Sequence, residues 1–338
     1  MILMITIILS LLTIPVYGEE QIQNSDVDDV MSYASIQQNA IDRGIDYLKS
    51  GRDEYNVWND LDDFRTAYVI DVMEFLSESC ISKNEADNLI DGVYDYYNSL
   101  YVTNSNDLSN LLLINEFHED NDIVCLKNLQ NHDGGFGLSD GYASDIIDTK
   151  LAMKALADVG ETEAMNKAAK YIASLQNDDG GFSYQQGLES DPGLSAEIAD
   201  VYGDCIIADQ SIASDFSDTL NALETYLDEN LPSLDRLSAD NIPEVYQNFY
   251  TVLFRLKKGE KVDVSAYYAL QAENGGVFDD PLATALFLEM IVREQNALTA
   301  SIDHISITND KGYSVSSFNA NENVRKHGIQ EILRQARI

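Results

Sequence analysis

Basic residues are scarce in this sequence. Its 338 residues hold 21 lysines and arginines against 58 aspartates and glutamates, a formal net charge of −37. A potential of that sign repels phosphate backbones and anionic lipid surfaces, so we expect no nucleic-acid partner. The acidic excess fits a soluble surface protein, a salt-rich setting or an affinity for cations, and solubility is the simplest of the three. Hydrophobic residues make up 45%, enough for a sizeable core.

Cysteine is also scarce, with three residues. Cys80, Cys125 and Cys205 each lie in a mostly apolar segment with helical periodicity. An odd number of cysteines does not form a disulfide framework, so we expect buried thiols. One bridge stays open as an alternative, and the sequence does not choose its pair.

Only the N-terminus has a long hydrophobic run, and no other stretch is suited to cross a membrane. Residues 1–18 are apolar, contain Pro15, and end with Val16 and Gly18 before two glutamates, as a secretory signal peptide does. No Lys or Arg precedes the run, and an uncleaved anchor is the rival interpretation, although the run is short for a span. We expect a secreted or cell-surface protein with no other membrane association. Residues 19–40 are polar, and we expect an acidic disordered leader there.

A short motif recurs between residues 129 and 277. Its copies are Leu-Gln-Asn-His-Asp-Gly-Gly-Phe at 129–136, Leu-Gln-Asn-Asp-Asp-Gly-Gly-Phe at 175–182 and Leu-Gln-Ala-Glu-Asn-Gly-Gly-Val at 270–277. Gln130 and Gln176 are 46 residues apart, and Gln271 follows after 95, close to two such steps. The spacing predicts a degenerate copy near 223–227, and 44–48 resembles another.

Each copy predicts the junction between two paired helices. The glycines end the first helix because they accept positive φ, and we expect the aromatic that follows to turn inward. A second, more apolar helix then begins, as at 145–156, with Ser144 or Asp145 as its N-cap. We assign a structural role to Gln130, Gly134, Gly135, Phe136, Gln176, Gly180, Gly181, Phe182, Gln271, Gly275 and Gly276.

The repeats predict an all-α body at 41–296. We place six helix pairs near 41–78, 84–117, 121–159, 163–210, 216–257 and 262–296. Such pairs bury their apolar faces only by stacking, either as an open solenoid or as a closed ring. After residue 300 the pattern alternates at 302–308 and 313–318, which predicts two strands. We expect 301–338 to be a truncated β-sandwich start with a basic tail, from a truncated or frame-shifted gene.

The motif resembles the repeats of squalene and oxidosqualene cyclases and of protein prenyltransferase β subunits. The resemblance covers 41–296 and implies a closed (α/α)6 toroid, the terpenoid-cyclase and prenyltransferase fold. It fixes no activity, because thioester domains and cobalamin carriers share the ring. The Cys-x-x-Gln pair that thioester domains need is absent.

The resemblance also implies where ligands would bind. Prenyltransferase zinc is held by an Asp, a Cys two residues later and a distant His, near the starts of inner helices. The corresponding starts here offer neither Asp-x-Cys nor His, so we expect no metal and no protein prenylation. Their carboxylates remain candidates for a ligand at this end of the ring, which we call the ring mouth. They are Asp62, Asp63, Asp145, Asp148, Asp191 and Asp279.

The class II cyclases use an Asp-x-Asp-Asp motif to protonate their substrate. Asp60, Asp62 and Asp63 match it by letter, and clustered carboxylates can keep one proton available. The family's motif lies in a late inner helix, whereas this copy lies in the first repeat, and the chain has one tryptophan and no second barrel domain. We therefore favour a helix start with acids that suit the helix dipole.

Two hypotheses of function follow. The first is a non-catalytic surface module that binds a protein, a glycan or a small ligand, with cobalamin carriers as a special case, or that spaces domains. The second is an extracellular relative of the cyclases or prenyltransferases. We expect no cofactor; calcium is the one open alternative, at loops 133–141 and 177–181, where turn and capping roles are favoured. An apolar, aromatic-lined hollow with a carboxylate would favour the enzyme, and a polar hollow would favour binding.

Overall fold

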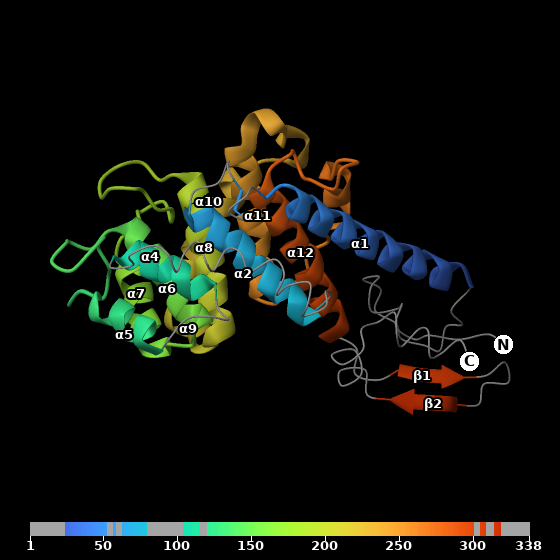
Figure 1. Cartoon of the computed structure of the whole chain (residues 1–338), viewed down its shortest axis with the longest axis horizontal. Coiled ribbons are helices and arrows are strands. Elements are labelled where there is room, and N and C mark those ends of the chain that lie inside the picture. Colours follow the sequence, from blue (N-terminus) through green and yellow to red (C-terminus); the bar gives the residue numbers. More distant parts are fainter. Residues whose placement is uncertain are drawn as a thin grey trace.

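The computed structural model describes residues 24–52, 57–58, 63–79, 104–114, 120–300, 305–308 and 314–318. Most of them are helical (Figure 1). The helices are α1 (Asn24–Ser50), α2 (Asp63–Ser79), α4 (Ser105–Leu113), α5 (Asp120–Asn128), α6 (Ile146–Asp158), α7 (Thr162–Ala173), α8 (Pro192–Ala208), α9 (Ser211–Asp215), α10 (Ser217–Asn230), α11 (Ile242–Lys257) and α12 (Pro281–Ala300). Short 3₁₀ turns lie at Leu234–Arg236, Ala239–Asn241 and Ser265–Leu270.

The helices close into a ring. Among the described residues, α2, α4, α6, α8, α11 and α12 form an inner layer in which each helix contacts the next. The last of them, α12, contacts both α2 and α1, so the two ends of the helical body meet (Figure 1). Helices α5, α7 and α10 precede inner helices along the chain, as the pairing predicted. The predicted all-α toroid is confirmed, and the open solenoid is not formed.

The inner helices are buried on several sides because their sequences are rich in apolar and small residues. In α12, the residues from Leu282 to Val292 are all buried, and α8 and α11 are nearly as enclosed. A helix that is apolar around most of its circumference is stable only inside a larger core. The inner layer therefore forms the core of the ring.

One prediction about the N-terminal part is wrong. Residues 24–40 of the expected disordered leader belong to α1, in which Gln37 and Ala40 are buried. The acids at 26–29 suggested a solvated segment, but acids are also favoured in the first turns of a helix. Residues 1–23, with the expected signal peptide, lie outside the described residues. So do Cys80 and the first helix of the second pair.

Two strands follow the toroid. β1 (Ile305–Thr308) and β2 (Ser314–Phe318) form the antiparallel pair that the alternating pattern predicted. The rest of the expected tail at 301–338 lies outside the described residues.

The repeated glutamines bind neighbouring repeats together. Each side-chain amide donates to the carbonyl of the first motif glycine and to a backbone carbonyl of another outer helix. The pairs are Gln130 to Gly134 (2.9 Å) and Ala164 (2.9 Å), Gln176 to Gly180 (2.8 Å) and Thr219 (2.9 Å), and Gln271 to Gly275 (2.9 Å) and Ala40 (2.9 Å). Since Ala40 lies in α1, the last copy joins the end of the ring to its beginning. We call this two-bond contact the glutamine clasp.

The first glycine of each copy lies against the same neighbouring helix. Gly134, Gly180 and Gly275 have φ of 89°, 88° and 93°, which glycine alone adopts readily. A Cβ on them would lie 2.5, 2.4 and 2.1 Å from the carbonyl oxygens of Lys167, Ala222 and Arg43, respectively. Glycine is thus required by φ and by space. The degenerate segments at 223–227 and 44–48 lie in the helices that receive these contacts, α10 and α1.

The predicted inward turn of the motif aromatics is confirmed. Phe136 and Phe182 are both 0% exposed, and each backbone N–H donates to a hydroxyl near the start of an inner helix, on Thr149 and Ser195 respectively (2.8 Å each). These contacts fix each junction to the helix that follows it.

The described cysteines are free thiols. Cys205 is buried and Cys125 is half-buried. Within the described ranges, no helix combines the length and the apolar character that crossing a membrane requires.

Candidate functional site

The carboxylates expected at the ring mouth mostly cap helices. Asp145 Oδ1 accepts hydrogen bonds from the N–H groups of Ile147 and Asp148 (2.9 Å each), and Asp191 Oδ1 accepts one from Leu194 (2.8 Å). These bonds satisfy N–H groups that a helix start leaves without partners. Asp145 is thus the cap, which resolves the choice between it and Ser144.

Of the remaining ring-mouth candidates, Asp279 bonds within its own loop, where it accepts a hydrogen bond from the Asn274 amide (2.8 Å). Asp63 is the first residue of α2, and Asp60 and Asp62 lie outside the described residues.

Asp148 is a ring-mouth carboxylate with a raised pKa. It is 6% exposed, and burial together with the adjacent Asp145 raises its pKa to about 6. Asp145 is the N-cap of α6 and Asp148 lies in the first turn of the same helix, so the two carboxylates belong to one helix start.

The loops considered for calcium use their oxygens internally. Asp133 Oδ1 accepts from the Gly135 N–H (3.0 Å) and the Ser144 hydroxyl (2.7 Å). Asp179 Oδ1 makes the same two bonds with Gly181 (3.0 Å) and Ser190 (2.7 Å). No group of three or more His, Cys, Asp or Glu side chains is placed to hold a metal ion anywhere in the described part of the chain.

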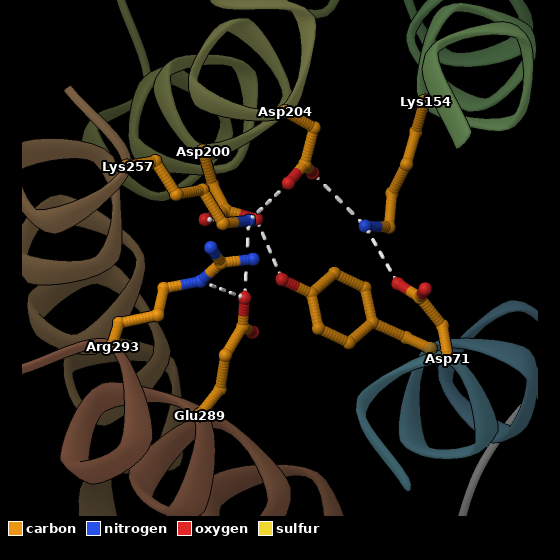
Figure 2. A network of polar contacts seen from close by, with 8 residues as sticks. Asp71, Lys154, Asp200, Asp204, Lys257, Glu289 and Arg293 are labelled. Atoms are coloured by element: carbon orange, nitrogen blue, oxygen red, sulfur yellow. Dashed lines mark hydrogen bonds and ion pairs between the residues drawn. The ribbon is translucent and has the colours of Figure 1, made fainter. Parts of the chain in front are cut away.

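The interior of the ring holds a group of charged side chains that sequence analysis did not find (Figure 2). We call it the interior network. It consists of Tyr68 and Asp71 from α2, Lys154 from α6, Asp200 and Asp204 from α8, Lys257 from α11, and Glu289 and Arg293 from α12.

Lys257 is the most enclosed cation of the interior network. Its side chain is 0% exposed, and Nζ lies 2.7 Å from Asp200, 2.7 Å from Asp204 and 3.5 Å from Glu289. Burial alone would lower the pKa of Lys257, but these three carboxylates outweigh it and raise the pKa. Lys257 is therefore charged and joins α11 to α8 and α12.

Lys154 joins α6 to α2 and α8 in the same way. Its Nζ lies 2.8 Å from Asp71 and 3.0 Å from Asp204, and 4.4 Å from the centre of the Tyr68 ring. Burial would lower the pKa of Lys154, but Asp204 and Asp71 raise it well above its usual value. The two lysines together hold the pKa of Asp204 far below its usual value despite its burial.

Asp200 is the acid of the network that most readily holds a proton. The Tyr68 hydroxyl donates to its Oδ2 at 2.6 Å, and Lys257 lies at its Oδ1. Burial raises the pKa of Asp200 to about 6, although Lys257 opposes the shift. The network has four carboxylates and three cations, so a proton on Asp200 makes it neutral.

A cavity of about 520 Å³ lies beside the interior network. It extends to the ends of α6 and α8, where Asp158 and Ala208 are the last residues. Asp145, Asp148, Asp191 and Asp279 lie at or just before the starts of inner helices, and none of these four lines the cavity. The lining residues are Asp71, Val72, Glu74, Phe75, Lys154, Ala157, Asp158, Gly160, Asp204, Ile207, Ala208, Glu289 and Arg293.

The cavity wall combines charged side chains with apolar surface. Among the described residues that line it, seven side chains are ionisable and one, Phe75, is aromatic. The Arg293 guanidinium lies 4.4 Å from the centre of the Phe75 ring, so a cation already covers that ring. Among its described residues the wall is charged and about half apolar, so it matches neither the apolar, aromatic-lined hollow nor the polar hollow distinguished from the sequence.

Comparisons with known proteins agree with this architecture. The family described as prenyltransferase alpha-alpha toroid domain matches residues 65–195. No curated protein matches the chain.

Solved structures match over most of the toroid. The type II terpene cyclase MstE from Scytonema, as a variant in complex with its product merosterolic acid A, is 11% identical, with a TM-score of 0.55 over 78% of this chain and 99% of that one. Another MstE variant, without ligand, is 12% identical over the same shares, with a TM-score of 0.56. A protein from Actinoplanes is 11% identical, with a TM-score of 0.56 over 77% and 99% of the two chains. Likeness at this identity establishes the fold. This chain thus has the α/α toroid fold of these structures, and its residues 65–195 are similar to the prenyltransferase alpha-alpha toroid domain.

Proposed function

We propose that this protein is an exported, non-catalytic toroid that binds a small hydrophilic ligand in the interior cavity. The observation that carries the proposal is the charged wall of that cavity. An apolar polyprenyl chain placed there would remove water from carboxylates such as Asp71, Asp204 and Glu289 without replacing its hydrogen bonds, which costs several kcal/mol for each charged group.

The ion pairs among the side chains that line the cavity support the same proposal. Lys154 and Arg293 are each paired with a carboxylate of the interior network, so the wall is rigid before any ligand arrives. A preformed polar pocket favours binding because little ordering is needed. At about 520 Å³, the cavity falls in the usual range for small-ligand pockets.

Export is supported by the apolar residues 1–18. A secreted form would begin near Glu19, and N-terminal sequencing of protein recovered from the culture medium tests this. An intact Met1 on protein retained in the cell would contradict export.

Thermal-shift screening tests ligand binding. Glycans, amines, amino acids and corrinoids are offered to the wild type and to Ala208→Trp, in which an indole at the cavity edge blocks entry. A ligand at about 100 times its Kd stabilises the wild type by about 2.7 kcal/mol, and the variant loses this gain. Ala213→Trp, at an exposed position of the short helix α9, is the matched control and keeps it. A shift that Ala208→Trp leaves intact contradicts binding in the cavity.

A second candidate function, acid catalysis, is favoured by Asp200. A buried carboxyl that holds its proton up to about pH 6 has the chemistry of a general acid. However, Asp200 does not line the cavity, and Tyr68 and Lys257 occupy its oxygens. Incubation with squalene and with geranylgeranyl diphosphate, followed by mass spectrometry, separates the two functions. A cyclised product that disappears in Asp200→Asn would establish catalysis and overturn the proposal.

A further inference from the structure

Two loops of the ring expose apolar side chains at equivalent positions. They follow the first two copies of the repeat, and we call them loop A (residues 137–144) and loop B (residues 183–190). Each loop has an apolar pair, two and six residues after the phenylalanine of its motif. The exposed fractions are 43% for Leu138, 60% for Tyr142, 54% for Tyr184 and 55% for Leu188. Because an exposed apolar surface is costly in water, its concentration in one region commonly marks a binding site.

The two loops have the same internal hydrogen bonds, which hold the apolar pairs in place. In each loop, the N–H of the second apolar residue donates to the carbonyl three residues earlier, and its own carbonyl accepts from an asparagine amide of the motif. The bonds are Tyr142 to Ser139 (3.0 Å), Leu188 to Gln185 (3.2 Å), Asn131 to Tyr142 (3.0 Å) and Asn177 to Leu188 (3.2 Å). A surface that is ordered in advance loses little conformational entropy when a partner binds.

Both loops lie on the same side of the ring. Loop A leads to the start of α6 and loop B to the start of α8, and the two project together at the left of Figure 1. The interior cavity extends to the opposite ends of these two helices. The exposed apolar pairs therefore belong to a surface separate from the cavity.

The surroundings of the apolar pairs are acidic. Asp140 in loop A and Glu189 in loop B are both exposed. The sequence has no lysine or arginine from 128 to 149 and none from 171 to 235. A cation does reach loop B from α2. Burial and the carboxylates of Asp191 and Glu197 raise the pKa of the Tyr184 hydroxyl, although Arg65 opposes them. A surface of this charge attracts basic groups and repels acidic ones.

We infer that loops A and B form a docking surface for a basic segment of another protein. Apolar side chains of that segment pack on the two apolar pairs, and its lysines or arginines lie beside Asp140 and Glu189. Tyrosines that anchor an interface within a polar rim are typical of protein recognition. A polypeptide offers both apolar and basic side chains, which a neutral glycan does not. Because the surface is separate from the cavity, this inference goes beyond the proposed function and does not depend on it.

The experiment is isothermal titration calorimetry of the full chain with three synthetic peptides of equal length. One combines leucine and lysine with helical periodicity, the second has glutamate in place of lysine, and the third has serine in place of leucine. The leucine–lysine peptide binds the wild type at least about tenfold more tightly than either of the others. Removal of both tyrosines, Tyr142→Ser with Tyr184→Ser, weakens its binding at least about tenfold. Removal of both charges, Asp140→Asn with Glu189→Gln, weakens it about three- to tenfold.

Matched controls separate the loops from the rest of the surface. Ile36→Ser with Val124→Ser removes two side chains that are 48% and 51% exposed on α1 and α5, and it leaves peptide binding unchanged. Glu229→Gln, at an exposed acid on outer helix α10, does the same. All variants keep the urea midpoint of the wild type within error, because each replaced side chain is exposed.

Three results would overturn the inference. If the leucine–lysine peptide does not bind, or the leucine–glutamate peptide binds equally well, no basic apolar segment is recognised. If the paired tyrosine variant binds the leucine–lysine peptide as the wild type does, the peptide collects elsewhere on the acidic surface. A neutral oligosaccharide that binds the wild type and not the paired tyrosine variant, while the peptide fails, would assign the loops to a glycan. Each of these results leaves ligand binding in the cavity, and its test with Ala208→Trp, unaffected.

Discussion

Replacing Lys257 with methionine tests the interior network most sharply. Methionine keeps most of the volume of the side chain and removes the charge. Without Lys257, Asp204 still has Lys154 at 3.0 Å and Glu289 still has Arg293 at 2.7 Å, so Asp200 alone loses its cation. Breaking a buried ion pair costs about 3–5 kcal/mol, and because two of the three carboxylates keep partners we expect about 3 kcal/mol. This is a large fraction of the roughly 5–15 kcal/mol that stabilises a typical domain.

The loss should depend on pH. Asp200 already has a pKa of about 6, and removal of Lys257 raises it further, so at about pH 5 the side chain is protonated and its need for a cation disappears. Urea unfolding followed by circular dichroism at neutral pH and at about pH 5 measures both effects.

Lys167→Met is the matched control for Lys257→Met. Lys167 is 55% exposed and pairs with Glu163, which is 85% exposed, so we expect a change within about 0.5 kcal/mol. If Lys257→Met costs no more than Lys167→Met at neutral pH, or if its cost does not decrease at about pH 5, the network does not stabilise the ring as described.

Three further predictions concern the ring and the network. Gly275→Ala places a Cβ 2.1 Å from the Arg43 carbonyl oxygen, so it should lower the free energy of unfolding, measured in urea, by more than about 2 kcal/mol. The control Gly259→Ala has a similar φ of 84°, but its Cβ would have no atom within 4 Å, so it should cost only about 1–2 kcal/mol. Equal costs would refute the close contact at Gly275. Phe182→Ala should lower the free energy of unfolding by about 3–5 kcal/mol, and a loss below about 1 kcal/mol would contradict its full burial. The folded-state pKa of Asp200 is raised to about 6, so its ionisation lowers stability as pH rises from about 4 to 6; Asp200→Asn should flatten this part of the stability profile, and an unchanged profile would show that Asp200 does not titrate there.

The fold could be predicted because each copy of the repeat determines a junction between two helices from residues close together in the sequence. A glutamine and two glycines at fixed spacing mark each helix end, and the positive φ of Gly134, Gly180 and Gly275 explains why glycine stands there. Ring closure could not be derived from local pattern alone. It depends on Gln271 reaching the carbonyl of Ala40, a contact between distant parts of the chain.

The site was harder to predict. Acids at helix starts drew attention because they stand out in sequence, but Asp145 and Asp191 are N-caps. The interior network comes from five helices, and each contributes one or two polar residues to a largely apolar segment. The available signal was Asp200 with Asp204, and Glu289 with Arg293, each pair four residues apart on a buried helix. Which helices meet could not be read from either pair.

The position of a bound cation in a crystal would show whether the toroid interior is a charged binding cavity. Crystals of the full chain soaked in hexaamminecobalt(III) would be measured at the cobalt absorption edge. We expect an anomalous peak inside the cavity, near Asp71, Asp204 and Glu289. Cobalt bound only on the outer surface, with the cavity filled by apolar side chains, would contradict it.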